Sequence, residues 1–186
     1  MIRCFLAINL EPQVIEKIYQ SIDDLRERIL AVRWVPPPNL HLTVKFFDDI
    51  EEARVEPIAV ALQDQLELFP RFTINAKGLG VFPERGRPKI LWVGLTGNEL
   101  AGLAAKVQSS LLPLGFAPEQ RSFTPHLTIG RWRDSDRAPR TLKQELERWR
   151  NCTFGHSVVN EVILMQSVLK ADGAVYHRLK VISLGK

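Results

Sequence analysis

Hydrophobic and polar residues alternate with two different periods along this chain. Three stretches carry apolar residues every three or four positions, which predicts amphipathic helices over residues 12–30, 51–67 and 98–112, and a more polar helix is expected near 138–149. Shorter apolar stretches, bounded by Pro, Gly and Asp, favour strands. The expected strands cover residues 2–10, 32–35, 39–47, 72–82, 90–95, the segment that begins at 126, 157–169 and 174–184.

The order of these elements indicates the fold class. Tight hairpins are expected within residues 72–95 and 157–184, and no glycine-rich phosphate loop follows the first strand, so a doubly wound parallel sheet fits poorly. Short strands that interleave with helices predict instead an α+β protein of two similar lobes, each an antiparallel sheet with helices on its outer face. We expect a single bilobal domain over residues 1–186.

One tetrapeptide pattern occurs twice. The sequence HLTV at residues 41–44 recurs as HLTI at residues 126–129, 85 positions later. Side chains alternate between the two faces of a strand, so each His would share a face with its Thr while the two aliphatic residues anchor the other face. If the two motif strands face each other across a central cleft, two imidazoles and two hydroxyls meet in one space. That set of groups suits proton transfer at a phosphate.

A chance origin of this pattern is improbable. In random shuffles of this composition, two of the four histidines would meet a Thr two positions downstream roughly once in a hundred. The alternative is that two amphipathic strands each carry a His for packing. His156 and His177 lack the pattern, and we expect them to be surface or packing residues.

The paired motifs, half a chain apart, resemble those of the two-histidine (2H) phosphoesterase superfamily. Within it they are most similar to the bacterial and archaeal RNA 2',3'-cyclic phosphodiesterases, also called 2'-5' RNA ligases. One position departs from the family pattern, which usually has Gly shortly after the Phe of the first motif, where this chain has Asp48. The likeness covers nearly the whole chain and is carried by Trp34 and residues 3–8, 39–46, 78–83, 91–94, 123–131, 167–169 and 173–176.

The resemblance implies an activity and roles for the motif residues. It implies hydrolysis of RNA 2',3'-cyclic phosphate ends to 2'-phosphate ends without a metal or other cofactor, and some relatives also form 2'-5' linkages without ATP. It implies His41 as proton donor and His126 as proton acceptor, although the two motifs are too alike for the residues alone to decide. Thr43 and Thr128 would donate hydrogen bonds to the non-bridging phosphate oxygens.

Two basic residues near the motifs are harder to place. The resemblance implies that Arg131 binds substrate, but simple alternation puts it on the face opposite His126 unless Gly130 forms a bulge. Simple alternation puts Lys45 on the same face of the strand as His41. It could add positive charge at the rim of the cleft, or it could be a solvated residue at the strand end.

Aromatic residues could stack on the terminal base of an RNA substrate. Phe5, Trp34 and Phe82 are candidates, but the sequence does not separate them from core residues.

Composition narrows the class of protein. The formal net charge of +4, with basic clusters at 84–89 and 131–140, is compatible with an anionic partner. The two cysteines lack the spacing of a zinc site or a disulfide framework. No apolar run approaches the roughly 18 residues of a membrane span, and residues 1–10 are expected to form a strand rather than a signal peptide. We expect a cytoplasmic monomer that acts on RNA ends and does not engage a membrane.

Other functions stay open at this point. The same chemistry could act on 2'-5' oligonucleotides or on small cyclic nucleotides. A non-catalytic RNA-binding relative would keep the cleft, but it has no need of paired titratable groups. A metal-dependent hydrolase would need further carboxylate or His ligands at suitable spacing, and the sequence offers no such cluster. A nucleotide triphosphatase has no support, because no Walker-type loop is present.

Overall fold

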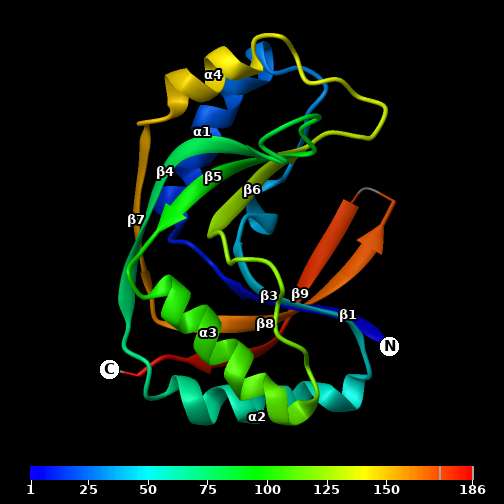
Figure 1. Cartoon of the computed structure of the whole chain (residues 1–186), viewed down its shortest axis with the longest axis vertical. Helices are drawn as coiled ribbons and strands as arrows, with labels where there is room; N and C mark the ends of the chain where they lie inside the picture. Colours follow the sequence, from blue (N-terminus) through cyan, green and yellow to red (C-terminus); the bar gives the residue numbers. More distant parts are fainter. Residues whose placement is uncertain (172, 186) are drawn as a thin grey trace.

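Nine strands form one antiparallel sheet in the computed structural model, which describes residues 1–171 and 173–185. The strands are β1 (Ile2–Ile8), β2 (Arg33–Trp34), β3 (Leu42–Ile50), β4 (Phe72–Phe82), β5 (Ile90–Thr96), β6 (His126–Arg131), β7 (Thr153–Val159), β8 (Glu161–Lys170) and β9 (Gly173–Ser183). Their order in the sheet is β7-β4-β5-β6-β3-β1-β8-β9, and β2 pairs with β6. The sheet curls strongly, so that β4, β5 and β6 form one half and β1, β8 and β9 belong to the other (Figure 1).

Four α-helices cover the outside of this sheet. They are α1 (Pro12–Arg28), α2 (Val55–Leu66), α3 (Leu100–Leu111) and α4 (Leu142–Trp149), and three short 3-10 helices are η1 (Pro37–Asn39), η2 (Glu52–Arg54) and η3 (Leu112–Leu114). Helix α1 contacts β7, and α4 contacts β4. Helices α2 and α3 contact each other, and they also contact β9 and β3, respectively (Figure 1). The predicted α+β fold of two lobes with outer helices is confirmed. Among the described residues, no helix is both long enough and apolar enough to cross a membrane.

The spacing of apolar residues explains why α1 forms and how it packs. Its buried residues are Val14, Ile18, Ile22 and Leu25, which recur every three or four positions and therefore lie on one face. Pro12 occupies the first turn, where its missing N–H costs no helical hydrogen bond.

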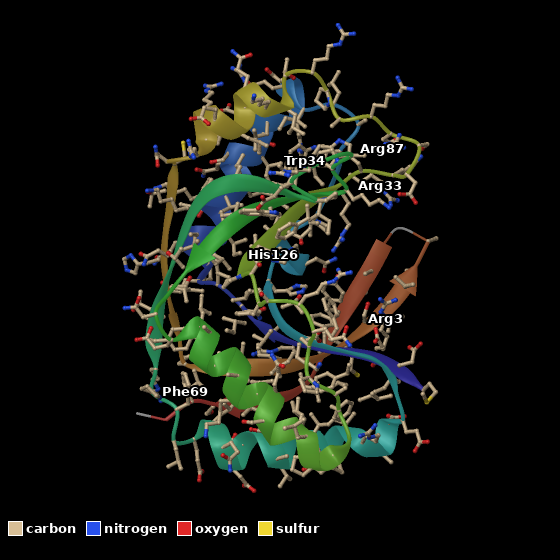
Figure 2. All side chains as sticks on the ribbon, in the orientation of Figure 1. Arg3, Arg33, Trp34, Phe69, Arg87 and His126 are labelled. Atoms are coloured by element: carbon tan, nitrogen blue, oxygen red, sulfur yellow. The ribbon has the colours of Figure 1, made fainter. Side chains whose placement is uncertain are left out.

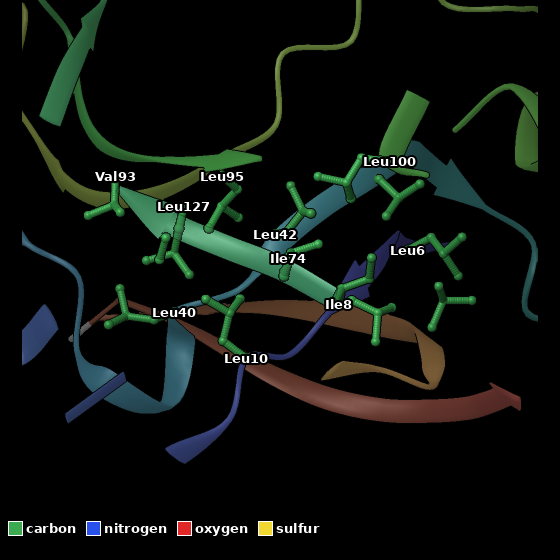
Figure 3. Packing of buried hydrophobic residues seen from close by; sticks show 14 of the residues in the cluster. Leu6, Ile8, Leu10, Leu40, Leu42, Ile74, Val93, Leu95, Leu100 and Leu127 are labelled. Carbon is green, nitrogen blue, oxygen red and sulfur yellow. The ribbon is translucent and has the colours of Figure 1, made fainter. Parts of the chain in front are cut away.

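The two halves of the sheet meet at the motif strands. Strands β3 and β6 pair antiparallel through one pair of residues, Leu42 opposite Leu127, which we call the seam. Both leucines are fully buried and belong to the same hydrophobic cluster as Leu6, Ile74 and Val93 (Figure 3). The aliphatic residues of the motifs therefore anchor the two strands on the buried face of the sheet, opposite the His and Thr side chains, as their alternation predicts.

Among the boundaries that differ from the sequence prediction, two have a clear structural cause. The stretch expected as one strand over 157–169 is two strands that separate at Asn160, because β7 pairs with β4 in one half-sheet and β8 pairs with β1 in the other. Strand β3 does not end at Asp48 but continues to Ile50. Asp48 adopts a positive φ of 56°, a conformation that Gly adopts without strain and that Asp tolerates better than most residues.

Candidate active site

The seam brings the two predicted motifs together on one face of the sheet. An antiparallel register that pairs the seam leucines sets Thr43 opposite His126 and Thr128 opposite His41. All four side chains lie on the face away from the buried leucines and are half-buried. The four residues predicted from the sequence thus come from β6, from β3 and from the residue just before β3, and they surround one space.

Each imidazole is held by the same backbone contact. The Nδ1 atom of His41 lies 2.8 Å from the carbonyl oxygen of Asn39, and the Nδ1 atom of His126 lies 2.7 Å from that of Thr124. A carbonyl oxygen can only accept, so Nδ1 carries the hydrogen in both rings. In each neutral ring Nε2 then carries the free lone pair, and it is the nitrogen available for proton transfer.

Two aromatic side chains flank each imidazole. At the first motif, Phe5 stacks on the imidazole with ring centroids 4.8 Å apart, and Tyr176 meets it edge-on at 5.2 Å. At the second motif, Phe82 meets the imidazole edge-on at 4.9 Å and Trp92 lies 6.4 Å away. These rings exclude water from one side of each imidazole.

This environment lowers the pKa of both histidines. Burial lowers the pKa of His41 to about 4; the hydrogen bond to Asn39 opposes the shift, and the charges of Arg131 and His126 add to it. Burial also lowers the pKa of His126, against the effect of its bond to Thr124 and together with that of Arg131. Both imidazoles are therefore neutral near pH 7 in the ligand-free protein.

A bulge in β6 turns Arg131 toward the histidines. Thr128 pairs with Trp92, but Gly130 pairs with the adjacent residue Leu91, so one residue of β6 has no partner between them. Arg131 therefore lies on the same face as Thr128 rather than the opposite one. Its effect on the pKa of both imidazoles agrees with this placement.

A second bulge, in β3, has the opposite effect on Lys45. Thr43 pairs with Ala7 while Lys45 pairs with the adjacent residue Leu6, which turns Lys45 to the face opposite Thr43. Its side chain is buried, and its Nζ atom lies 2.8 Å from a carboxylate oxygen of Glu119. Lys45 is therefore neither at the rim of the site nor solvated, in contrast to both expectations.

The aromatic residues that could stack on a base differ in how far they are buried. Phe5 is buried, and Trp34 and Phe82 are half-buried. Phe46, which is not among these three candidates, is 53% exposed, and its ring lies 6.2 Å from that of Phe5. Strict alternation places Phe46 on the core face, and only the bulge in β3 brings it to the face of the site.

The remaining titratable candidates lie elsewhere. His156 and His177 are exposed, as expected. Burial, followed by the nearby Asp49, raises the pKa of the Cys4 thiol to about 11, so it is not a nucleophile near neutral pH. Within residues 1–171 and 173–185, no group of three or more His, Cys, Asp or Glu side chains is placed to hold a metal ion.

Known proteins resemble this chain over its full length. The family "LigT like Phosphoesterase" matches twice, over residues 8–92 and 93–176, once for each motif. The RNA 2',3'-cyclic phosphodiesterase of Aquifex aeolicus is 35% identical over 176 residues, 89% of this chain and 93% of that protein. The protein of the same name from Methanothermobacter thermautotrophicus is 32% identical over 184 residues, 98% and 99% of the two chains. A crystal structure of a Thermus thermophilus protein superposes with a TM-score of 0.83 at 26% identity, covering both chains completely.

Proposed function

Because the chain belongs to the LigT-like phosphoesterase family, we propose that it hydrolyses RNA ends with a 2',3'-cyclic phosphate to ends with a 2'-phosphate. The observation that carries the proposal is the pair of imidazoles brought together at the seam, each with Nδ1 donating to a carbonyl so that the lone pair lies on Nε2. The two relatives described above, which are named for this activity, support the choice of substrate.

The chemistry needs one neutral and one protonated imidazole. His126 accepts a proton from water as the water oxygen bonds to phosphorus, and His41 donates a proton to O3' as the P–O3' bond breaks. The five-membered ring is strained, so its opening needs no other energy source. A 5'-hydroxyl in place of water would give a 2'-5' linkage by the same steps and without ATP.

Three further side chains would stabilise the charge that builds on the non-bridging phosphate oxygens. The hydroxyls of Thr43 and Thr128 share the face of the imidazoles and are the donors that we assign to these oxygens. Arg131, turned to this face by the bulge in β6, supplies positive charge that neither Thr can provide.

The low pKa of His41 places a condition on this mechanism. A general acid must carry its proton before it donates it, whereas the ligand-free site favours the neutral ring. The negative charge of the bound phosphate would raise the pKa of His41 again and so prepare the acid. Binding of substrate and protonation of the acid are therefore linked.

The test is an assay of the purified protein, in the presence of a chelator, on an RNA oligonucleotide that ends in a 2',3'-cyclic phosphate. We expect a 2'-phosphate product and a bell-shaped dependence of rate on pH. His41→Ala and His126→Ala should each lower kcat about 100-fold to 10,000-fold. His156→Ala and His177→Ala, which change exposed histidines outside the site, should retain the rate.

Three results would overturn the proposal. Full activity in a folded His41 or His126 variant would remove the two-histidine mechanism. Loss of all activity with the chelator, restored by a divalent metal, would replace it with a metal-dependent one. Salt-sensitive RNA binding without any turnover would make the protein a binding module.

A further inference from the structure

A second arginine lies beside Arg131. The short strand β2 pairs antiparallel with β6, and in this register Arg33 is directly opposite Arg131. Residues opposite each other in an antiparallel pair project to the same face of the sheet. Since Arg131 is on the face of the imidazoles, Arg33 is on that face too.

The packing on the other face supports this placement. Trp34 is opposite Gly130 in the same register. A Cβ atom added to Gly130 would lie 2.4 Å from Cγ1 of Val32 and 3.5 Å from Cε3 of Trp34, so these two side chains cover Gly130. Val32 and Trp34 therefore occupy the face away from the site, and Arg33, which lies between them in the chain, has the opposite direction.

Among the described residues, no acidic side chain forms an ion pair with either arginine of this pair. Both are exposed, and no carboxylate of residues 1–171 or 173–185 lies within 4.0 Å of either guanidinium. Like charges directly opposite each other across two strands destabilise the pair. Arg33 also lies on the same side of the molecule as Arg87, which adds to the positive charge there (Figure 2). The arrangement becomes favourable when anions bind between these groups.

We propose that Arg33 binds a second phosphate of the substrate, namely the internucleotide phosphate on the 5' side of the terminal cyclic nucleotide. The inference rests on the proposed function, which places the reacting cyclic phosphate between the imidazoles and Arg131. An RNA strand carries one further phosphate for each further nucleotide, and the planar guanidinium is well suited to bind it. The preferred substrate is then an oligonucleotide rather than a nucleoside cyclic phosphate.

Three substrates separate this role from a general effect of charge. Adenosine 2',3'-cyclic phosphate has one phosphate. Its 5'-phosphorylated form and the dinucleotide ApA with a 2',3'-cyclic end each have two. Arg33→Gln should raise KM for the dinucleotide about tenfold, the effect of losing one charge-assisted hydrogen bond. It should leave kcat/KM for adenosine 2',3'-cyclic phosphate within about twofold, and lower the salt dependence of log KM for the dinucleotide by about 0.7.

Two controls exclude a structural explanation. Arg71→Gln removes an exposed arginine just before β4, on a different part of the surface, and should change none of these values. The melting temperature of Arg33→Gln without ligand should equal or exceed that of the unmodified protein, since a repulsive pair has been removed.

The outcomes are distinct. A selective loss for the dinucleotide, with or without a smaller loss for the 5'-phosphorylated mononucleotide, supports the inference. An equal loss for all three substrates, no loss at all, or a loss confined to the mononucleotide with a 5'-phosphate would overturn it. The proposed function fails differently, because the unmodified protein would then turn over none of the three substrates, and both proposals would be wrong.

Discussion

An anion bound between the motif strands should raise the pKa of His41 by several units. Burial lowers this pKa to about 4 in the ligand-free protein, so at pH 7 about one molecule in a thousand carries the proton that a general acid must donate. If the pKa is near 7 in the complex, half of the molecules carry the proton at pH 7. To raise the pKa that far, the bound anion must stabilise the protonated imidazole by about 4 kcal/mol. One negative charge about 4 Å from the ring contributes about 4 kcal/mol at an effective dielectric constant of about 20. A single bound phosphate is therefore sufficient.

Sulfate is the suitable probe, because it keeps its charge between pH 4 and 8 whereas a phosphate monoester titrates near pH 6. The Cε1–H resonance of His41, assigned with His41→Asn, can be followed against pH with and without saturating sulfate. Sulfate favours the protonated ring, so its affinity should fall as pH rises from the free to the bound pKa, by up to about tenfold per pH unit. Calorimetry in two buffers should show uptake of about one proton within this window.

The reasoning is refuted if sulfate binds but moves the pKa of His41 by less than one unit, or if its affinity does not depend on pH in the wild-type protein. A large shift of the His126 resonance with no shift of His41 would reverse the assignment of donor and acceptor. The exposed His177, which belongs to neither motif, provides the control within the same spectra, because its resonance should not move when sulfate is added.

Two other variants test separate parts of the structure. Arg131→Met should raise the pKa of both site imidazoles in the ligand-free protein, because a nearby positive charge opposes their protonation. The control Arg133→Met should leave both pKa values unchanged. A lower pKa of either imidazole in Arg131→Met, measured by NMR, would contradict the placement of Arg131. Asp48→Gly should stabilise the protein by about 1 kcal/mol, or about 2–4 °C in Tm, since position 48 has a φ of 56°. A lower Tm by calorimetry would show that the Asp side chain stabilises this conformation.

Local periodicity was sufficient to predict most of the fold. The apolar spacing of α1 depends on residues within a few turns of each other, and the alternation in the two motifs depends on four consecutive positions. Where a boundary depends on a distant partner, the sequence was insufficient. Asn160 separates two strands because β7 pairs with β4 in one half-sheet and β8 pairs with β1 in the other, and these partners lie far away in the sequence.

The same distinction applies to the candidate site. Two bulges decide which side chains share the face of the imidazoles, and a bulge is defined by the register of two strands rather than by one segment. One bulge places Arg131 on this face, and the other turns Lys45 away and exposes Phe46. Arg33 was missed for a similar reason, because its relation to Arg131 exists only through the pairing of β2 with β6.

The matching backbone supports of the two imidazoles have a consequence for regiochemistry. A carbonyl two positions upstream fixes each ring in the same tautomer. These backbone contacts therefore do not distinguish the proton donor from the proton acceptor. The cationic side chains do distinguish the two sides of the site, since Arg131 lies on β6 and Arg33 on the strand paired with it, both to one side of the seam. Under the proposed mechanism, these guanidinium groups would set the direction in which an RNA strand enters the site, and with it which ribose oxygen departs.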